Sequence, residues 1–198
     1  VNTVGYKKSD VEFKSLLYQE LQSKSTNNAG ENKPIPAQVG LGTRTASITT
    51  SYAQGSLQSV DNPNYMAIEG NGFFKVRNED GEICYTRDGS FNLMKAETGG
   101  VMLCTSDGHP VLDQKNNTIT IPESFKTGDK EYKTTGAMSV DVDGNLYMSY
   151  TDIENDTEKS VPITFTPAGG AAYNQRIVLA QFNNTAGFHQ AGGNLYKE

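Results

Sequence analysis

Side chains that could act as nucleophiles, proton carriers or metal ligands are few in this sequence. Its two histidines, His109 and His189, have no cysteine, carboxylate or second histidine at the spacing of a metal site. Its two cysteines, Cys84 and Cys104, each lie in an apolar run, where a free thiol packs as a small hydrophobic group. We therefore expect both thiols to be free, buried and inert, with a bridge between neighbouring strands as the alternative.

The acidic and glycine-rich stretches fit tight turns better than ligand sites. The string DVDGN at residues 141–145 resembles part of a calcium loop, but its glycine is fourth where such a loop needs one at the sixth position. Gly70 and Gly72 lack the third glycine of a dinucleotide fingerprint. We expect no enzyme activity, no cofactor and no metal. A hydrolase with carboxylates assembled in space, such as Asp152 and Glu154, is a weaker alternative.

The overall composition argues against several classes of partner. Among 198 residues, 17 are Lys or Arg and 23 are Asp or Glu, which gives a net charge of −6. These charges are interspersed without a basic stripe, so we expect no binding to nucleic acid and no membrane insertion. The 20 glycines and the 35% hydrophobic content favour many short strands with tight turns over a helical bundle.

The start of the chain predicts one short amphipathic helix. Ser9 and Glu12 have the spacing of a capping box, in which each side chain satisfies an amide of the first helical turn. An apolar stripe at helical spacing follows, made of Phe13, Leu16, Leu17 and Leu21. We expect a helix at residues 10–22, and residues 1–37 as an N-terminal region of extended segment, helix and arm.

The rest of the chain alternates short apolar runs with turn signals. Asp-Gly pairs at residues 80–81, 107–108 and 143–144 are typical of hairpins. The expected strands include residues 43–50, 65–69, 73–77, 82–87, 101–105, 138–142, 145–150 and 176–182. These elements predict a mainly β fold over residues 38–198, in which meandering antiparallel sheets form a partial barrel or sandwich. Residues 105–175 are a candidate sub-lobe.

Several strings together resemble the flagellar axial proteins, which build the bacterial rod and hook. They are NTVGYKK at 2–8, FKSLLYQ at 13–19, VGLGTR at 39–44, QGSL at 54–57, AIEGNGFFKV at 67–76, YTRDGSF at 85–91, LAQFNN at 179–184 and GNLY at 193–196. The resemblance is dense over residues 1–104, loose over 105–175 and clear again over 176–198. Any one string is a weak signal, but their common order is specific.

The resemblance implies a structural subunit of the flagellar basal body that assembles helically into a drive shaft. In the family, terminal coiled-coil helices, which are absent from this chain, line the inner tube and the β-rich middle forms the outer layer. The partners would be copies of the chain and other rod or hook proteins, after export through the flagellar secretion channel. The short middle region favours the distal rod, with the proximal rod and the hook as alternatives. Two cysteines depart from the family, whose members are usually poor in this residue.

Residues near the two ends of the chain are the best candidates for assembly contacts. The resemblance points to Asn2, Gly5 and Tyr6 at the start and to Asn194, Leu195 and Tyr196 at the end. Arg87 could pair locally with Asp88 or reach a neighbouring subunit. We expect the chain to be monomeric when isolated, since the strongest association in the family lies in its terminal helices.

A different class of protein stays open beside this one. An extracellular adhesin or carbohydrate-binding module would also be β-rich, and would need exposed aromatic residues beside polar groups on a concave face. Tyr147 and Tyr150 could belong to such a face, although nothing in the sequence singles them out.

Overall fold

The computed structural model describes residues 4–22, 37–96, 99–127, 130–153 and 155–198. Contacts divide the chain into two compact units, Lys7–Ala53 and the combination of Val1–Tyr6 with Gln54–Glu198. The regular structure is almost entirely antiparallel β, which confirms the mainly β prediction, and the described residues form no closed barrel.

The contacts group residues 38–53 with the start of the chain, because the strand that covers residues 43–50 pairs with the first strand. The expected division into residues 1–37 and 38–198, with residues 105–175 as a sub-lobe, stays a prediction about independent folding.

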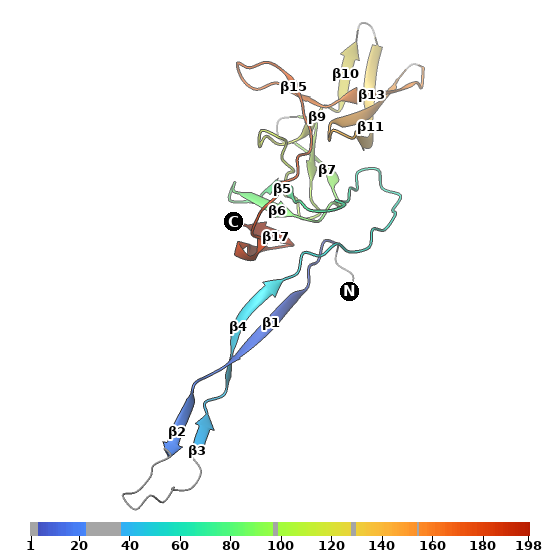
Figure 1. Ribbon diagram of the computed structural model, residues 1–198. Helices are drawn as coiled ribbons and strands as arrows, with labels where there is room; N and C mark the ends of the chain where they lie inside the picture. The colour runs from blue at the N-terminus through green and yellow to red at the C-terminus, as the bar shows by residue number, and fades with distance from the viewer. Residues whose placement is uncertain (1–3, 23–36, 97–98, 128–129, 154) are drawn as a thin grey trace, which may run out of the picture. The chain divides into compact units, whose positions relative to one another are not determined.

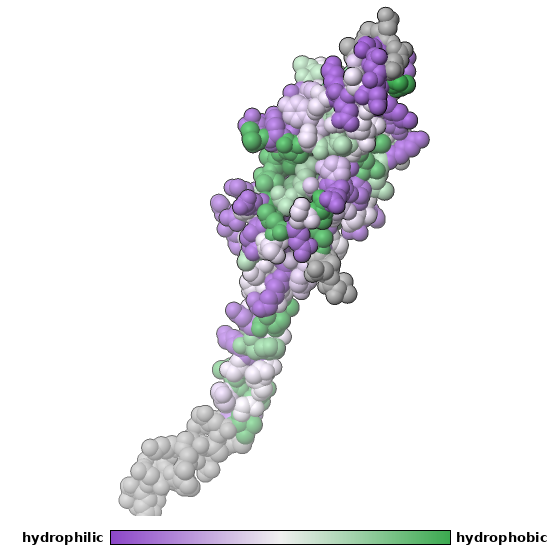
Figure 2. Space-filling view, turned by 90° about the vertical axis from the view of Figure 1, so that its right-hand side faces the viewer, coloured by the Kyte–Doolittle hydropathy of each residue, from purple (hydrophilic) through white to green (hydrophobic). Residues whose placement is uncertain are grey.

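The unit Lys7–Ala53 is a two-stranded antiparallel ribbon (Figure 1). β1 (Ser9–Ser15) pairs with β4 (Thr43–Thr50), and β2 (Tyr18–Gln22) pairs with β3 (Ala37–Gly40). A ribbon of two strands has no second layer to cover it, so most of its side chains are exposed. Figure 2 shows hydrophobic side chains on the surface of this ribbon.

The helix predicted at residues 10–22 is wrong, because these residues form β1 and β2. The two residues of the expected capping box bond across the ribbon instead. Glu12 accepts a hydrogen bond from Ser47 Oγ at 2.9 Å, and Ser9 Oγ lies 3.3 Å from Thr50 Oγ1. A short helix is marginal in water, whereas strand pairing satisfies the same backbone groups. Most of the expected arm, residues 23–36, lies outside the described residues.

The described residues of the second unit form four antiparallel sheets. The first has the strand order β16 (His189–Gly192), β17 (Leu195–Lys197), β6 (Ile83–Thr86) and β5 (Phe74–Arg77). The second has the order β7 (Asn92–Lys95), β8 (Val101–Cys104) and β9 (Thr120–Ile121). The third has the order β10 (Ser124–Thr127), β11 (Lys130–Val140), β12 (Leu146–Asp152) and β13 (Glu158–Pro162). The last pairs β14 (Thr164–Phe165) with β15 (Tyr173–Asn174), and a 3-10 turn, η1 (Thr185–Gly187), precedes β16.

One hydrophobic core runs through this second unit. Its fully buried members include Val76, Phe91, Leu103, Ile119 and Met148. They come from three of the four sheets and from the segments between strands, so the sheets share a single interior. In β12, residues alternate between the core and the surface along the whole strand, as a strand with one buried face requires.

The hairpins predicted at residues 80–81 and 143–144 are confirmed, while the Asp-Gly pair at 107–108 lies in a turn closed by an isolated bridge between Cys104 and Pro110. Gly81 (φ 83°) and Gly144 (φ 81°) take left-handed conformations in the turns that join β5 to β6 and β11 to β12. The strand predicted at residues 43–50 is confirmed as β4. Residues 65–69 and 176–182 are not strands: they make isolated bridges, such as Phe73 with Ala180. In the part of the chain that the structure describes, no helix is long and apolar enough to cross a membrane.

Candidate assembly site

The residues proposed from the sequence for assembly converge at one place within the second unit. β17 lies beside β6 (Figure 1), with Leu195 opposite Thr86 and Tyr196 opposite Tyr85. The segment at residues 4–6 meets both through the contacts of Asn194 and Gly5. We call this meeting point of residues 4–6, 86–90 and 193–197 the terminal junction. Asn2, also proposed, lies outside the described residues.

Asn194 connects the three segments of the terminal junction. Its Nδ2 donates to the Val4 carbonyl oxygen at 3.1 Å, and its own carbonyl oxygen accepts from Thr86 Oγ1 at 3.1 Å. Thr86 is buried, and its Oγ1 also accepts from the Asp88 amide at 3.1 Å. Buried hydroxyl groups need such partners, so this chain of hydrogen bonds specifies the register of the closing strand.

Gly5 allows the first segment to approach the loop that follows β6. Its φ is 72°, which side chains rarely adopt, and a Cβ atom placed there would lie 2.9 Å from the Asp88 amide nitrogen. Asp88 itself is held by an internal turn, in which its Oδ1 accepts from the Ser90 amide at 2.9 Å and from the Ser90 hydroxyl. The geometry therefore explains why glycine occupies this position.

Arg87 is engaged inside its own chain. Its Nη1 donates to the Gly70 carbonyl oxygen at 2.7 Å, and the guanidinium carbon lies 5.0 Å from the centre of the Phe73 ring. Its Nε is buried and has no hydrogen-bond partner among the described residues. Burial lowers the pKa of Arg87 from its usual value, although the group stays charged. Of the two roles considered from the sequence, the geometry favours a local one, with Gly70 as the partner.

Leu195 and Tyr196 lie in the interior. Their exposed fractions are 5% and 2%, and Tyr196 packs against the rings of Phe73 and Phe188 at centroid distances of 6.0 Å. Burial raises the pKa of the Tyr196 hydroxyl. Tyr6, by contrast, is 66% exposed, so it is the candidate whose side chain is available to a partner.

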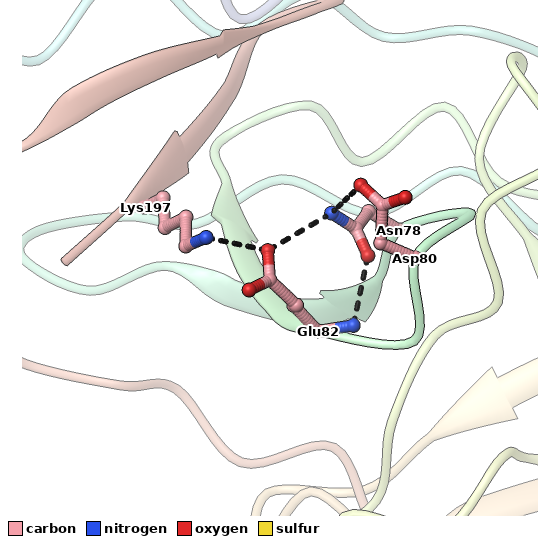
Figure 3. A network of polar contacts seen from close by, with 4 residues as sticks. All are labelled: Asn78, Asp80, Glu82 and Lys197. Carbon is pink, nitrogen blue, oxygen red and sulfur yellow. Dashed lines mark hydrogen bonds and ion pairs between the residues drawn. The ribbon is translucent and has the colours of Figure 1, made fainter.

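A surface ion pair also links the closing strand β17 to the residue that precedes β6 (Figure 3). Lys197 Nζ lies 2.5 Å from Glu82 Oε2, while Asn78 Oδ1 accepts from the Glu82 amide at 2.8 Å. The Asn78 Nδ2 group faces the carboxylates of Asp80 and Glu82, both at 3.5 Å. The hydrogen bond to Lys197 lowers the pKa of Glu82 and raises that of Lys197.

An open hollow of about 480 Å³ borders the terminal junction. Val4, Asp88, Ser90, Ser106, Asp107, Gly193 and Asn194 line it. Within the described part of the chain, no three His, Cys, Asp or Glu residues gather in a group that could hold a metal ion. The hollow is therefore a feature of surface shape with polar walls, and its two carboxylates come from neighbouring turns.

The other residues considered for chemistry are buried or take part in turns. Cys84 and Cys104 are free and fully buried, as predicted, and burial raises the pKa of both thiols. Asp141 accepts hydrogen bonds within its own turn from the amides of Asp143 and Asn145, both at 2.9 Å. Hydrogen bonds led by that from the Asn145 side chain lower the pKa of Asp141, so its carboxylate stabilises the hairpin turn that the sequence predicted.

The sequence interpretation missed Thr86 and considered Asp88 only as a possible partner of Arg87. Both residues stand inside the string YTRDGSF, next to Arg87. A threonine before an Asp-Gly pair is an ordinary strand ending, so no local signal marks Thr86 as a partner of Asn194, which is 108 residues away. Only the pairing of β6 with β17 brings them together.

Comparison with known proteins adds a family to this geometry. Residues 67–148 match the family model described as the flagellar hook protein FlgE/F/G D1 domain. The whole chain is 33% identical to the flagellar basal-body rod protein FlgG of Borreliella burgdorferi over 200 residues, and 32% identical to that of Bacillus subtilis over 198 residues. In both cases the chain spans 63% of the length of the curated relative.

A hook protein is also similar, over a shorter stretch. The flagellar hook protein FlgE of Borreliella burgdorferi is 38% identical over 93 residues, which is 47% of this chain and 21% of that protein. The chain is thus similar over its whole length to flagellar basal-body rod proteins, and residues 67–148, which lie in its antiparallel β structure, match a domain model shared by flagellar hook and rod proteins.

Proposed function

We propose that this chain is the β-rich part of a structural subunit of the flagellar rod, of the distal type, which assembles helically into the drive shaft. The observation that carries the proposal is the extent of the similarity. The rod relatives align over 100% of the chain, whereas the hook relative aligns over 47%. The partners are copies of the same protein and other rod or hook proteins, and the location is the flagellar basal body.

The proposal includes the absence of catalysis. The residues best suited to nucleophilic chemistry, Cys84 and Cys104, are fully buried with thiol pKa values raised by that burial. A thiol held in its neutral form away from solvent is a poor nucleophile. The carboxylate of Asp141 is engaged by its own turn. These side chains support a packing role in place of a chemical one.

We also propose that the terminal junction serves assembly in two ways. Tyr6 is exposed and can contact a neighbouring subunit directly, and Asn2 would lie in the same segment. The other candidates act from within. Contacts of Gly5, Asn194, Leu195 and Tyr196 hold the segment that carries Tyr6 and the closing strand in place, while Arg87 holds Gly70 and packs on Phe73.

Deletion of the gene tests the proposal, with electron microscopy of cells and of isolated basal bodies. We expect non-motile cells with truncated rods, and recovery when the unaltered gene is supplied on a plasmid. Complete rods that lack hooks would favour the hook protein. Normal rods and hooks in non-complemented cells would overturn the proposal, and glycan-binding screens would then test the adhesin alternative.

A further inference from the structure

We infer that Asn194 is a positioning residue that clamps the first described segment, residues 4–6, to the closing strand β17, and that this clamp is required for assembly. The second half of the inference rests on the proposed function. The first half stands on the geometry of the chain alone.

The backbone at Asn194 is in the left-handed region, with a φ of 59°. Gly192 and Gly193 just before it also have positive φ values, 91° and 53°, so the chain reverses tightly between β16 and β17. Asparagine is one of the few residues other than glycine that adopt this conformation readily. Glycine would therefore serve the turn as well or better, and the turn alone does not explain the residue.

The side chain of Asn194 supplies what glycine cannot. Its Nδ2 group donates to the Val4 carbonyl oxygen at 3.1 Å, across 190 residues of sequence. The Asn194 backbone carbonyl oxygen also accepts a hydrogen bond from Thr86 Oγ1, and the next residue, Leu195, pairs with Thr86 of β6. A single residue thus joins the start of the described chain to β17 and, through β17, to β6.

Among the described residues, few other contacts hold residues 4–6 against the loop that follows β6. Gly5 lies close against the Asp88 backbone, which a side chain at this position would overlap. Val4 and Tyr6 have exposed fractions of 60% and 66%, so little buried apolar area holds the segment in place. The hydrogen bond from Asn194 is consequently a specific polar contact that fixes residues 4–6.

The relative position of residues 4–6 and β17 matters for a subunit that repeats along an axis. In such an assembly each copy presents the same surfaces to its neighbours, and an error in orientation at one contact recurs at every step. The Asn194 clamp sets the position of Tyr6 relative to β17 within one copy. We therefore expect loss of the clamp to reduce assembly without loss of the fold.

Asn194→Gly and Asn194→Asp separate the turn from the hydrogen bond. Both keep a residue that tolerates a positive φ, but glycine has no side chain and an aspartate carboxylate cannot donate to a carbonyl oxygen. Asp156→Gly is the matched control, because Asp156 has a φ of 52° and an exposed side chain far from the terminal junction in sequence. All three variants should unfold at temperatures close to that of the unaltered protein.

Limited proteolysis of the purified full-length protein tests the clamp itself. We expect chymotrypsin to cleave after Tyr6 roughly five- to tenfold faster in Asn194→Gly and Asn194→Asp, as loss of one hydrogen bond predicts. Cleavage after the buried Phe91 should not change, and Asp156→Gly should leave cleavage after Tyr6 unaffected. Unchanged cleavage after Tyr6 in both Asn194 variants would overturn the inference.

Complementation of the deleted gene tests the part that concerns assembly. We expect Asn194→Gly and Asn194→Asp to restore swimming poorly, with fewer complete rods, while Asp156→Gly restores it fully. Faster cleavage after Tyr6 with normal swimming would show a clamp that assembly does not need, and would overturn that part. If deletion itself leaves the rods intact, the proposed function fails, and the clamp is judged by proteolysis alone.

Discussion

Hydrophobic side chains are largely exposed in the ribbon Lys7–Ala53 and largely buried in the second unit. In the ribbon, Phe13 and Leu17 are 70% and 86% exposed, whereas Phe91 and Leu103 in the second unit are fully buried. Both regions are antiparallel β and carry similar residue types. The difference arises because several sheets share an interior, while two strands alone cannot form one.

This contrast shows that apolar residues can have two purposes in one chain. In the second unit they provide the free energy that maintains the fold, at roughly 25 cal/mol per Å² of buried apolar surface. In the ribbon they contribute little to its own stability and remain available to other molecules. Large exposed apolar side chains of this kind are typical of interaction surfaces.

A matched pair of phenylalanine substitutions gives the largest expected contrast. Phe91→Ala removes a ring with 0% exposure and should lower the free energy of unfolding by about 3–5 kcal/mol. Phe13→Ala removes a ring that is 70% exposed and should change it by less than about 0.5 kcal/mol. Urea denaturation followed by circular dichroism measures both. Similar losses for the two variants would show that the ribbon packs against something in solution.

A pair of hairpin glycines separates steric overlap from backbone strain within the second unit. Gly144 and Gly81 have similar φ values, 81° and 83°, but only at Gly144 would a Cβ atom meet a neighbour, the Ile177 carbonyl oxygen at 2.6 Å. Gly81→Ala should cost about 1 kcal/mol from the strained φ alone. Gly144→Ala should cost about 1–3 kcal/mol more, because the backbone must shift. Equal shifts in thermal unfolding would mean that residue 177 moves freely.

A charge change tests the ribbon alone. Lys14 lies directly opposite Arg44, and like charges in that position destabilise a strand pair. Lys14→Glu should therefore slow hydrogen exchange in β1 and β4, equivalent to about 0.2–1 kcal/mol. A charge-neutral control is Lys14→Gln, which should give a smaller effect of the same sign. Faster exchange with glutamate would indicate that the paired cations are already neutralised by other groups.

The smallest expected effect concerns the exposed ion pair between Lys197 and Glu82. Because Lys197 lowers the pKa of Glu82, the pair stabilises the fold above the unfolded-state pKa of that carboxyl group. This stabilisation should disappear as the pH falls through the lowered pKa. At the alkaline end, Lys197 has a raised pKa, so its contribution is complete below its unfolded-state pKa and disappears as the pH rises through the folded value.

Unfolding of Glu82→Gln at several pH values measures this contribution. The difference from the unaltered protein should be small at neutral pH and absent in strong acid. Ionic strength should reduce it, since surface pairs are screened. A difference that persists in strong acid would show that Glu82 acts through packing or through Asn78 and not through its charge.

The sequence was sufficient for much of the fold in the second unit, where local signals agree. Asp80 with Gly81 and Asp143 with Gly144 predicted hairpin turns, and apolar runs beside them predicted strands that the structure contains. The burial of Cys84 and Cys104 followed in the same way from their apolar neighbours. Such predictions succeed because turn chemistry and side-chain alternation depend on residues that are adjacent in sequence.

The ribbon was misjudged because two periodicities overlap there. Phe13, Leu16 and Leu17 suggest a helical stripe, while Val11 and Phe13 alternate with charged residues as in a strand. Pairing with β4 selected the strand, and no residue within β1 indicates from the sequence that β4 is its partner. The choice of strand was therefore a long-range effect that local propensity could not supply.

Residue types and their order along the chain were enough to indicate a mainly β fold, its hairpin turns, a resemblance to the flagellar axial proteins and the candidate assembly residues near its two ends. The tertiary structure alone decided which of those residues are buried, since Leu195 and Tyr196 enter the core while Tyr6 stays exposed. It also decided the polar partners, such as Asn194 with Val4 and the buried Asp113 with Gln175 at 3.1 Å. The physical reason is that turns depend on neighbouring residues, whereas burial and buried hydrogen bonds depend on segments that meet only after the whole chain has folded.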